Sequence, residues 1–250
     1  MTKAESRIAV VTGAARSLGK ATAERLHGDG YSVAVIDRDG AAAADVAKAL
    51  DGQGKTARAY ALDVSSAEDV VKTFAAVASD LGVPTALVNN AGIYPDHALL
   101  DMPVEAWDQV MAVNLRGTFL CTQVFARLRG QSGSGAIVNL ASVAGFSARV
   151  GASHYSTSKA GVVMFTKAAA LELGPLGIRI NAVAPGLTRG EYSGESLDLE
   201  QDQATRDWIA SVTALGRMGE PRDIAEAITW LASDRASWIT GQVIDASGGW

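Results

Sequence analysis

The chain has 250 residues, of which 48 % are hydrophobic and 20 % are charged, and its formal net charge is −5. This composition excludes a disordered chain, because the apolar fraction is high and the net charge per residue is low. A single cysteine, Cys121, excludes a disulfide scaffold, and a pI of about 5.2 disfavours a nucleic-acid partner. Glycine is in excess, with 26 residues in the chain, where a typical share is ~7 %.

The start of the chain gives no sign of a targeting segment. Residues 1–7 are polar and charged, and the apolar run Ile8–Val11 is too short for a signal peptide. No stretch approaches the ~18 apolar residues of a membrane span. We therefore expect a cytoplasmic protein without a membrane partner, and the lack of an internal linker predicts a single domain over residues 1–250.

Short apolar runs alternate with longer helical patterns along the chain. Most runs are apolar throughout, which is typical of strands buried on both faces of a parallel sheet. We expect strands over Ile8–Val11, Val33–Ile36, Ala59–Leu62, Ala86–Val88, Ala136–Leu140, Ile178–Val183 and Gln242–Ile244. We expect helices over Leu18–Gly30, Ala41–Leu50, Ala67–Leu81, Glu105–Arg129, Ser153–Leu173 and Pro221–Ser233. The alternation predicts one doubly wound α/β domain, with ligands beyond the carboxyl ends of the strands.

The first expected strand runs directly into a glycine loop, Thr12 to Gly19, that opens a helix. A helix N-terminus offers free N–H groups and a partial positive charge, so a pyrophosphate can lie there where side chains leave room. Asp37 stands at the end of the second expected strand. Its distance from the glycine loop is close to the ~20 residues at which an acid binds the adenosine ribose in such folds. Because its carboxylate would repel a 2′-phosphate, Asp37 favours NAD over NADP. Arg16 and Arg38 are the opposing signals, because either could reach a 2′-phosphate.

Tyr155 and Lys159 lie four residues apart and share one helix face. With Ser142 upstream of them, the chain resembles the short-chain dehydrogenase/reductase family over essentially its whole length. The motifs that carry the resemblance are the loop Thr12–Gly19, Asp63, Asn89-Asn90-Ala91-Gly92, Asn114, Ser142, Tyr155-x-x-x-Lys159 and Pro185-Gly186. The resemblance implies a Rossmann-type domain with a seven-stranded parallel sheet in the order 3-2-1-4-5-6-7 and helices on both faces.

A carbonyl group that accepts a hydride also needs a proton. A phenol has a pKa of ~10, which a neighbouring ammonium lowers, so we expect Tyr155 to be the general acid/base and Lys159 to tune it. The resemblance implies that Lys159 also binds the nicotinamide ribose, that Ser142 holds the substrate oxygen, and that Asn114 supports a water relay beside Lys159.

The resemblance also implies the cofactor contacts, from the phosphate loop to the nicotinamide pocket. They are Gly13, Arg16, Ser17, Leu18, Gly19, Asp37, Asp63, Val64, Asn90, Gly92, Tyr155, Lys159, Pro185, Gly186 and Thr188. Asp63 and Val64 would flank the adenine. Ser17 departs from the family pattern, because it replaces the middle glycine of the loop; its side chain would either crowd the phosphates or donate a hydrogen bond to them.

Loops beyond the strand ends supply the candidate substrate contacts. They are Tyr94, Ser142, Phe146, Tyr192 and Trp208. In the family, the segment that corresponds to residues 187–214 closes over the substrate as a lid, and such lids exclude water. Within it, we expect Thr188 to Arg206 to be a long surface loop. The aromatic and aliphatic walls favour an apolar or aromatic substrate, and no residue cluster has the spacing of metal ligands.

We therefore predict an NAD-dependent short-chain alcohol dehydrogenase or ketone reductase, with NADP the less favoured cofactor, acting on a small or medium apolar or aromatic carbonyl compound or alcohol. The alternative is an NADPH-dependent 3-oxoacyl-thioester (acyl-carrier-protein) reductase, in which Arg127 and Arg129 dock an acidic carrier. A non-catalytic dinucleotide-binding scaffold is a weaker alternative, because all four catalytic residues are present.

The resemblance implies a homotetramer assembled through the helices over Glu105–Arg129 and Ser153–Leu173 and through the last strand. Trp250 has no local core to join in the sequence pattern. We hypothesise that it packs at a subunit interface.

Overall fold

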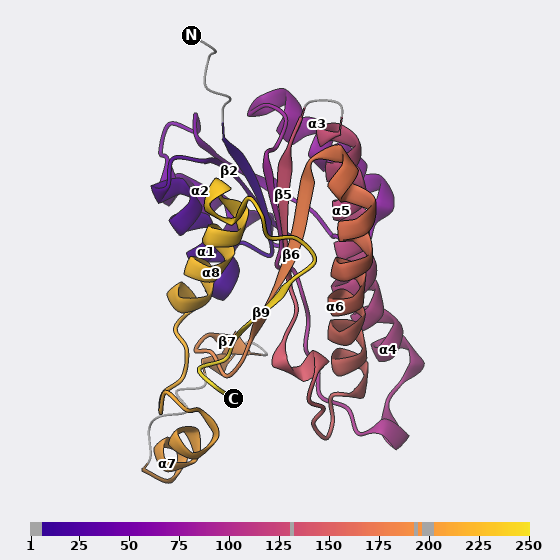
Figure 1. Cartoon of the computed structure of the whole chain (residues 1–250), viewed down its shortest axis with the longest axis vertical. Coiled ribbons are helices and arrows are strands. Elements are labelled where there is room, and N and C mark those ends of the chain that lie inside the picture. The colour runs from indigo at the N-terminus through magenta and orange to yellow at the C-terminus, as the bar shows by residue number, and fades with distance from the viewer. Residues whose placement is uncertain (1–6, 131–132, 193–194, 197–202) are drawn as a thin grey trace.

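The computed structural model describes residues 7–130, 133–192, 195–196 and 203–250. One parallel seven-stranded sheet forms its centre, in the order β3-β2-β1-β4-β5-β6-β9 (Figure 1). The strands are β1 (Ile8–Thr12), β2 (Ser32–Asp37), β3 (Ala57–Ala61), β4 (Ala86–Asn89), β5 (Gly135–Leu140), β6 (Ile178–Pro185) and β9 (Val243–Ala246). Counted within the sheet, this order is 3-2-1-4-5-6-7, so the predicted topology is confirmed.

Helices cover both faces of the sheet, as predicted (Figure 1). On one face lie α1 (Ser17–Gly28), α2 (Gly40–Leu50) and α8 (Pro221–Ala232). On the other face lie α3 (Ala67–Asp80), α5 (Gly117–Arg129) and α6 (Ser153–Leu173). The shorter helix α4 (Val104–Val110) packs beside α6.

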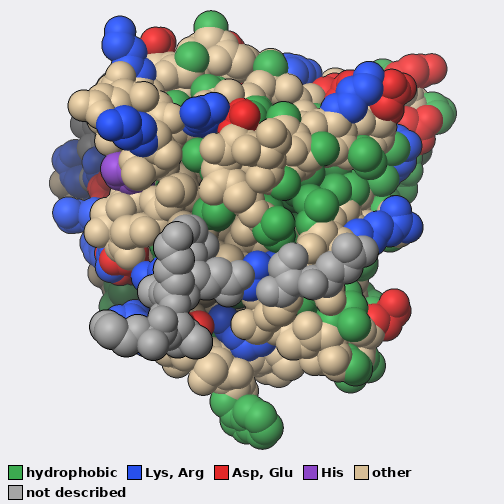
Figure 2. Space-filling view, turned by 90° about the horizontal axis from the view of Figure 1, so that it is seen from above, with side chains coloured by type: hydrophobic (Ala, Val, Ile, Leu, Met, Phe, Trp, Pro, Cys, Tyr) green, Lys and Arg blue, Asp and Glu red, His purple; other side chains and the backbone are tan. Residues whose placement is uncertain are grey.

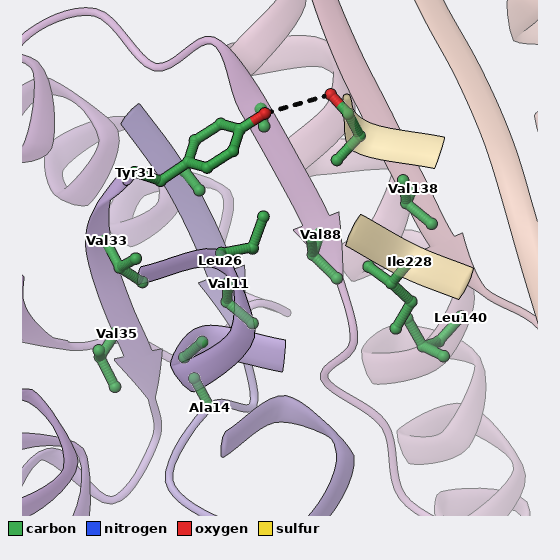
Figure 3. Close-up of a cluster of buried hydrophobic side chains, with 14 of the residues drawn as sticks. Val11, Ala14, Leu26, Tyr31, Val33, Val35, Val88, Val138, Leu140 and Ile228 are labelled. Atoms are coloured by element: carbon green, nitrogen blue, oxygen red, sulfur yellow. Dashed lines mark hydrogen bonds between the residues drawn. The ribbon is translucent and has the colours of Figure 1, made fainter. Parts of the chain in front are cut away.

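Each buried strand contributes to two separate cores, because neighbouring residues of a strand point to opposite faces of the sheet. In β1, Val11 faces the core under α1, α2 and α8, whereas Val10 faces the core under α3, α5 and α6. Figure 3 shows the first core, in which Leu26 of α1 packs among strand valines. The Tyr31 hydroxyl donates to the Ala232 carbonyl at 3.4 Å and ties β2 to α8. Because a core covers each face of the sheet, the strands are apolar throughout rather than alternating.

Two expected elements differ from the prediction. The helix expected over Glu105–Arg129 is continuous, but its middle, Met111–Arg116, is π-helical and separates α4 from α5. The loop expected over Thr188 to Arg206 is wrong in part: it contains two short antiparallel strands, β7 (Glu191–Tyr192) and β8 (Glu195–Ser196), and the start of α7 (Gln203–Val212). Figure 1 shows α7 standing away from the sheet beyond the end where β6 and β9 finish.

The exterior carries charges of both signs. Figure 2 shows lysine and arginine side chains interspersed with acidic ones around the edge of one face. Among the residues that the structure describes, no helix has the length and apolar character needed to span a membrane.

Candidate active site

The loop between β1 and α1 is locked against the end of β4. The Asn90 side chain donates to the carbonyls of Thr12 and Gly13 at 2.9 Å each, and the Thr12 hydroxyl accepts from the backbone of Asn90 at 3.1 Å. A Cβ on Gly19 would overlap the Gly13 carbonyl oxygen, and a Cβ on Gly13 would lie 2.8 Å from the Ala91 backbone. The loop therefore accepts only glycine at both positions, and this packs the chain tightly beneath the N-terminus of α1.

The N-terminus of α1 carries neither a side-chain cap nor an acidic residue in its first turn. Its N–H groups and the positive end of its dipole therefore remain for a ligand. Arg16 precedes the helix in an extended conformation, Ser17 begins it, and Leu18 turns into the first core. Ser17 has φ 45° and is the one non-glycine residue with positive φ in the described ranges. The five predicted loop residues thus lie in one turn at the N-terminus of α1.

Asp37 lies beside this loop, as predicted. Its carboxylate accepts from the Ala15 backbone at 3.1 Å and from the Asp39 backbone at 3.0 Å. These bonds fix both carboxylate oxygens at the carboxyl end of β2, next to the phosphate loop. The sequence could give only the spacing of Asp37 from the loop; the bond to Ala15 gives the contact itself.

The predicted adenine contacts, Asp63 and Val64, differ in exposure. Hydrogen bonds from Ser65, with a smaller contribution from Arg38, lower the pKa of Asp63, which stays ionised at the loop after β3. Val64 is buried in the second core against Gly117, where a Cβ would lie 2.7 Å from a valine methyl. Val64 therefore packs mainly inward.

Lys159 is the centre of the candidate catalytic group. Its ammonium donates to the Leu140 carbonyl at 2.6 Å, at the end of β5, and lies 5.7 Å from the centre of the Tyr155 ring. Burial lowers the pKa of Lys159 to about 8. Ser142 follows β5 two residues later, is nearly buried, and accepts from the Ala144 backbone at 3.1 Å. The fold thus places Ser142 near the carbonyl that anchors Lys159.

Asn114 lies in the π-helical turn and links this group to the end of β4. Its amide bonds the backbone of Ile93 twice, accepting at 2.8 Å and donating at 3.0 Å, and it donates to the Ser158 hydroxyl at 3.1 Å. A Cβ on Gly92 would lie 3.4 Å from Asn114 Oδ1 and 3.7 Å from Lys159 Nζ. The structure therefore brings Gly92, Asn114 and Lys159 together, and no sequence signal foresaw the π-helical turn that does so.

Tyr94 packs directly against the candidate general acid. The rings of Tyr94 and Tyr155 meet edge to face, with centroids 4.3 Å apart. The Arg149 guanidinium lies 4.7 Å from the centre of the Tyr94 ring and pairs with Asp96 at 2.6 Å. Burial raises the pKa of Tyr94, which keeps the phenol neutral. Tyr94 is thus a predicted substrate contact that packs directly on Tyr155.

The other predicted substrate contacts lie further out or outside the description. Phe146 is 59 % exposed. Trp208 of α7 is half-exposed, and its ring lies 6.2 Å from that of Trp250, edge to face. Trp250 therefore has one aromatic neighbour in its own chain, far from it in the sequence, and its packing at a subunit interface stays a hypothesis. Tyr192 belongs to β7, and its side chain is outside the described part of the chain.

The predicted nicotinamide pocket lies where β6 ends. A Cβ on Gly186 would lie 2.6 Å from the Ser247 side chain, so this turn also accepts only glycine. Thr188 is buried and donates its hydroxyl to the Gly186 carbonyl at 3.2 Å. Its own hydroxyl hydrogen is therefore already engaged within the turn.

The sequence reasoning did not foresee a buried amide pair beside the site. Asn89 and Asn139 end or nearly end apolar strands, and their amides bond one another at 2.9 Å; Asn89 also donates to Thr122 and Asn139 to Thr166. A polar residue inside an otherwise apolar strand was the available signal. In the described ranges, no group of three or more His, Cys, Asp or Glu side chains is placed to hold a metal ion.

The fold and this site define an oxidoreductase of the nicotinamide-dependent Rossmann type, and comparison with known proteins gives the family. A family model described as enoyl-(acyl carrier protein) reductase matches residues 13–250. The (3R)-3-hydroxyacyl-CoA dehydrogenase of Rattus norvegicus is 38 % identical, with 98 % of this chain and 96 % of that protein covered. The 3-oxoacyl-[acyl-carrier-protein] reductase of Aquifex aeolicus is 38 % identical, with 99 % and 98 % covered.

A solved structure with a matching description has the same fold. A putative short-chain alcohol dehydrogenase from Sinorhizobium meliloti superposes with a TM-score of 0.90 at 34 % identity, covering 97 % of this chain and 95 % of that one. The chain belongs to the short-chain dehydrogenase/reductase family.

Proposed function

We propose that the protein transfers a hydride between a nicotinamide dinucleotide and a carbonyl group or secondary alcohol. The observation that carries this proposal is the buried ammonium of Lys159, 5.7 Å from the ring centre of Tyr155 and anchored on the strand that leads to Ser142. A cation at this range stabilises a phenolate and lowers the pKa of the phenol. Tyr155 then serves as the proton donor in reduction and the acceptor in oxidation.

When bound, the reduced nicotinamide supplies the hydride to the carbonyl carbon. The Ser142 hydroxyl holds the carbonyl oxygen, and Tyr155 gives that oxygen its proton. At pH 7, a Lys159 with a pKa of about 8 is roughly nine-tenths protonated, so burial leaves it charged for this task. Asn114 holds Ile93 and Ser158 around it, and this arrangement suits the proposed relay of protons toward Lys159.

NAD(H) is the proposed cofactor, and the carboxylate of Asp37 supports it. Both oxygens of this carboxylate are fixed by backbone donors beside the phosphate loop, so the charge cannot turn away from a 2′-phosphate. The competing signal comes from Arg16 and Arg38, and Arg38 also acts electrostatically on Asp63. The proposed cofactor path runs from Asp37 and Asp63 past Gly92 to Gly186.

We propose a small or medium apolar or aromatic ketone or alcohol as the substrate, because the aromatic ring of Tyr94 packs against the ring of Tyr155. The second candidate is a 3-hydroxyacyl or 3-oxoacyl thioester, and the relatives named for those substrates favour it. The expectation that Arg129 helps to dock an acidic carrier protein is wrong, because Arg129 is fully buried. It donates a hydrogen bond to the Ser134 carbonyl at 2.5 Å. Residues 187–214 would close over either substrate.

A homotetramer remains our proposal for the assembly. Its support is the apolar surface that α5 and α6 expose. On these two helices Phe119, Met164 and Leu171 are all exposed, although single exposed apolar residues are common on monomers.

The test is Tyr155→Phe. This substitution removes the proton donor, so turnover should fall by about a thousandfold, while NADH titrated by its fluorescence should bind nearly as before. Tyr60→Phe makes the same change on the edge strand β3, where the hydroxyl donates to Asp80, and should keep full turnover. Initial rates with NADH and NADPH, on a simple ketone and on an acetoacetyl thioester, separate the candidates. Full turnover by Tyr155→Phe would refute the mechanism.

A further inference from the structure

His154 is a buried titratable side chain that the proposed reaction does not use. It lies in the first turn of α6, directly before Tyr155, and is fully buried. Neither of its ring nitrogens has a hydrogen-bond partner among the residues that the structure describes. Buried polar groups nearly always have one, so an unpartnered imidazole beside the proposed general acid calls for a functional explanation.

The ring of His154 faces a second histidine on a different segment. The rings of His97 and His154 meet edge to face, with centroids 5.9 Å apart. The backbone N–H of His97 donates to the Gly151 carbonyl at 3.0 Å, and the preceding residue, Asp96, pairs with Arg149 at 2.6 Å. Three contacts of different kinds thus join the loop after β4 to the start of α6 and the segment before it.

The same two segments carry the aromatic pair of the candidate active site. Tyr94 packs on Tyr155 with ring centroids 4.3 Å apart, and the Arg149 guanidinium lies 4.7 Å from the centre of the Tyr94 ring. The contacts close a ring of side chains that we call the histidine clamp: Tyr155, Tyr94, Arg149, Asp96, His97 and His154. Since Tyr94 and His97 share one loop, displacing His97 also disturbs the packing of Tyr94 on the general acid.

The surroundings of His154 disfavour its charged form. Burial is the main cause that lowers the pKa of His154 below its ordinary 6.5, His97 adds to this effect, and Asp96 opposes it. Within the described chain, the acidic residues of the neighbouring helix α4, Glu105 and Asp108, do not contribute to the shift. When the loop moves away and water reaches the ring, the ring takes a proton at its ordinary pKa. The closed clamp is therefore favoured above pH 6.5 and becomes less stable as the pH falls below that value.

We propose that His97 and His154 are positioning residues for the proposed reaction. As a neutral pair they hold the loop that carries Tyr94 against the helix turn that carries Tyr155, and a proton on His154 releases this loop and weakens binding of the carbonyl substrate. The inference rests on the proposed function. Because bound substrate favours the closed loop, the proton changes KM far more than kcat.

NMR of the histidine rings tests the clamp without a substrate. The chain has three histidines, so single substitutions assign their ring signals. The His154 signal should titrate below pH 6.5, and the protection of the His97 amide against hydrogen exchange, taken relative to its intrinsic rate, should fall about tenfold between pH 7 and pH 5. In His154→Phe, which keeps a ring against His97 and takes no proton there, this protection should stay level. The matched control is His27→Gln on α1, where His27 bonds Thr56 at 3.0 Å, and it should leave both observations unchanged.

The KM of a carbonyl substrate tests the effect on the site. The probe is acetoacetyl-CoA or cyclohexanone, whichever turns over faster. The ratio of the wild-type KM to that of His154→Phe should rise at least about threefold between pH 7 and pH 5, while the ratio of the kcat values stays level. Taking the ratio removes the titrations that both proteins share, including those of Tyr155 and Lys159.

The clamp and the proposed function fail differently. A His154 ring that titrates at pH 6.5 or above, a His97 amide whose protection in the wild type does not change with pH, or a level KM ratio would overturn the clamp. The wild-type titration needs no variant, so it decides the matter even where His154→Phe does not fold. Wild-type protein that turns over neither probe with NADH or NADPH would refute the proposed function, and the NMR measurements would still decide the clamp.

Discussion

Lys159→Met should make the protein more stable at neutral pH while it destroys the proposed catalysis. Burial lowers the pKa of Lys159 from 10.5 to about 8, so holding the charged form inside the fold costs about 3 kcal/mol at pH 7. The substitution removes that cost, but it leaves the Leu140 carbonyl without the ammonium at 2.6 Å, which costs roughly 1–3 kcal/mol. The net gain in unfolding free energy is therefore about 1 kcal/mol.

The pH dependence is the sharper measurement. The folded state releases the Lys159 proton at a lower pH than the unfolded state does, because its pKa is lowered. Wild-type stability is therefore reduced most below pH 8 and recovers as pH rises through 8 toward 10.5. The advantage of Lys159→Met over the wild type should shrink by about 2 kcal/mol between pH 7 and pH 9.5.

Urea unfolding at several pH values measures the free energy of unfolding of both proteins. Subtracting one value from the other removes the contributions of the titrating groups that the two proteins share. Lys167 lies on the exposed side of the same helix, so Lys167→Met is the matched control and should show no such trend. A difference between wild type and Lys159→Met that stays constant from pH 7 to pH 9.5 would refute the reasoning.

Two further substitutions test the cofactor and the lid. Asp37→Asn removes the charge but keeps a polar side chain beside Ala15, so the ratio of kcat/KM for NADPH to that for NADH should rise at least about tenfold; an unchanged ratio would exclude Asp37 as the discriminating group. Trp250→Ala removes the edge contact with Trp208, worth about 0.5–1.5 kcal/mol, and should speed proteolytic cleavage within α7 with NADH affinity intact. Sedimentation of the same variant shows whether assembly weakens too, as the interface hypothesis requires, and cleavage at the wild-type rate would count against the contact with Trp208.

The strands of the parallel sheet could be located from the sequence because buried parallel strands are apolar throughout, as the runs around Val10 and Val35 are; their order in the sheet came from the family resemblance. Helix periodicity likewise located α6 to the residue. The π-helical turn at Asn114 was beyond reach, because one additional residue in a turn leaves the apolar pattern nearly unchanged. Helix α7 was hidden by the polar, acidic residues before it.

The site was predictable where a motif carries its own geometry, as with the spacing of Tyr155 and Lys159. It was not predictable where two distant segments meet. The contact between Trp208 and Trp250 depends on how the segment after β6 folds back, and no local spacing encodes that. The burial of Arg129 was also not foreseen, because an arginine at a helix end is ordinarily solvated; here the turn that follows α5 covers it.

The amides of Asn89 and Asn139 have a consequence for folding. The two residues are direct partners in the alignment of β4 with β5, and their side chains bond at 2.9 Å inside the protein. A slip of β5 by one residue would turn Asn139 to the opposite face, break this bond and leave the Asn139 amide without these partners. Purely apolar strands would tolerate such a slip far better. This amide pair therefore fixes the register of β5 against β4. As a result, Asn90 after β4 and the segment after β5 that leads to Ser142 begin at the same edge of the sheet.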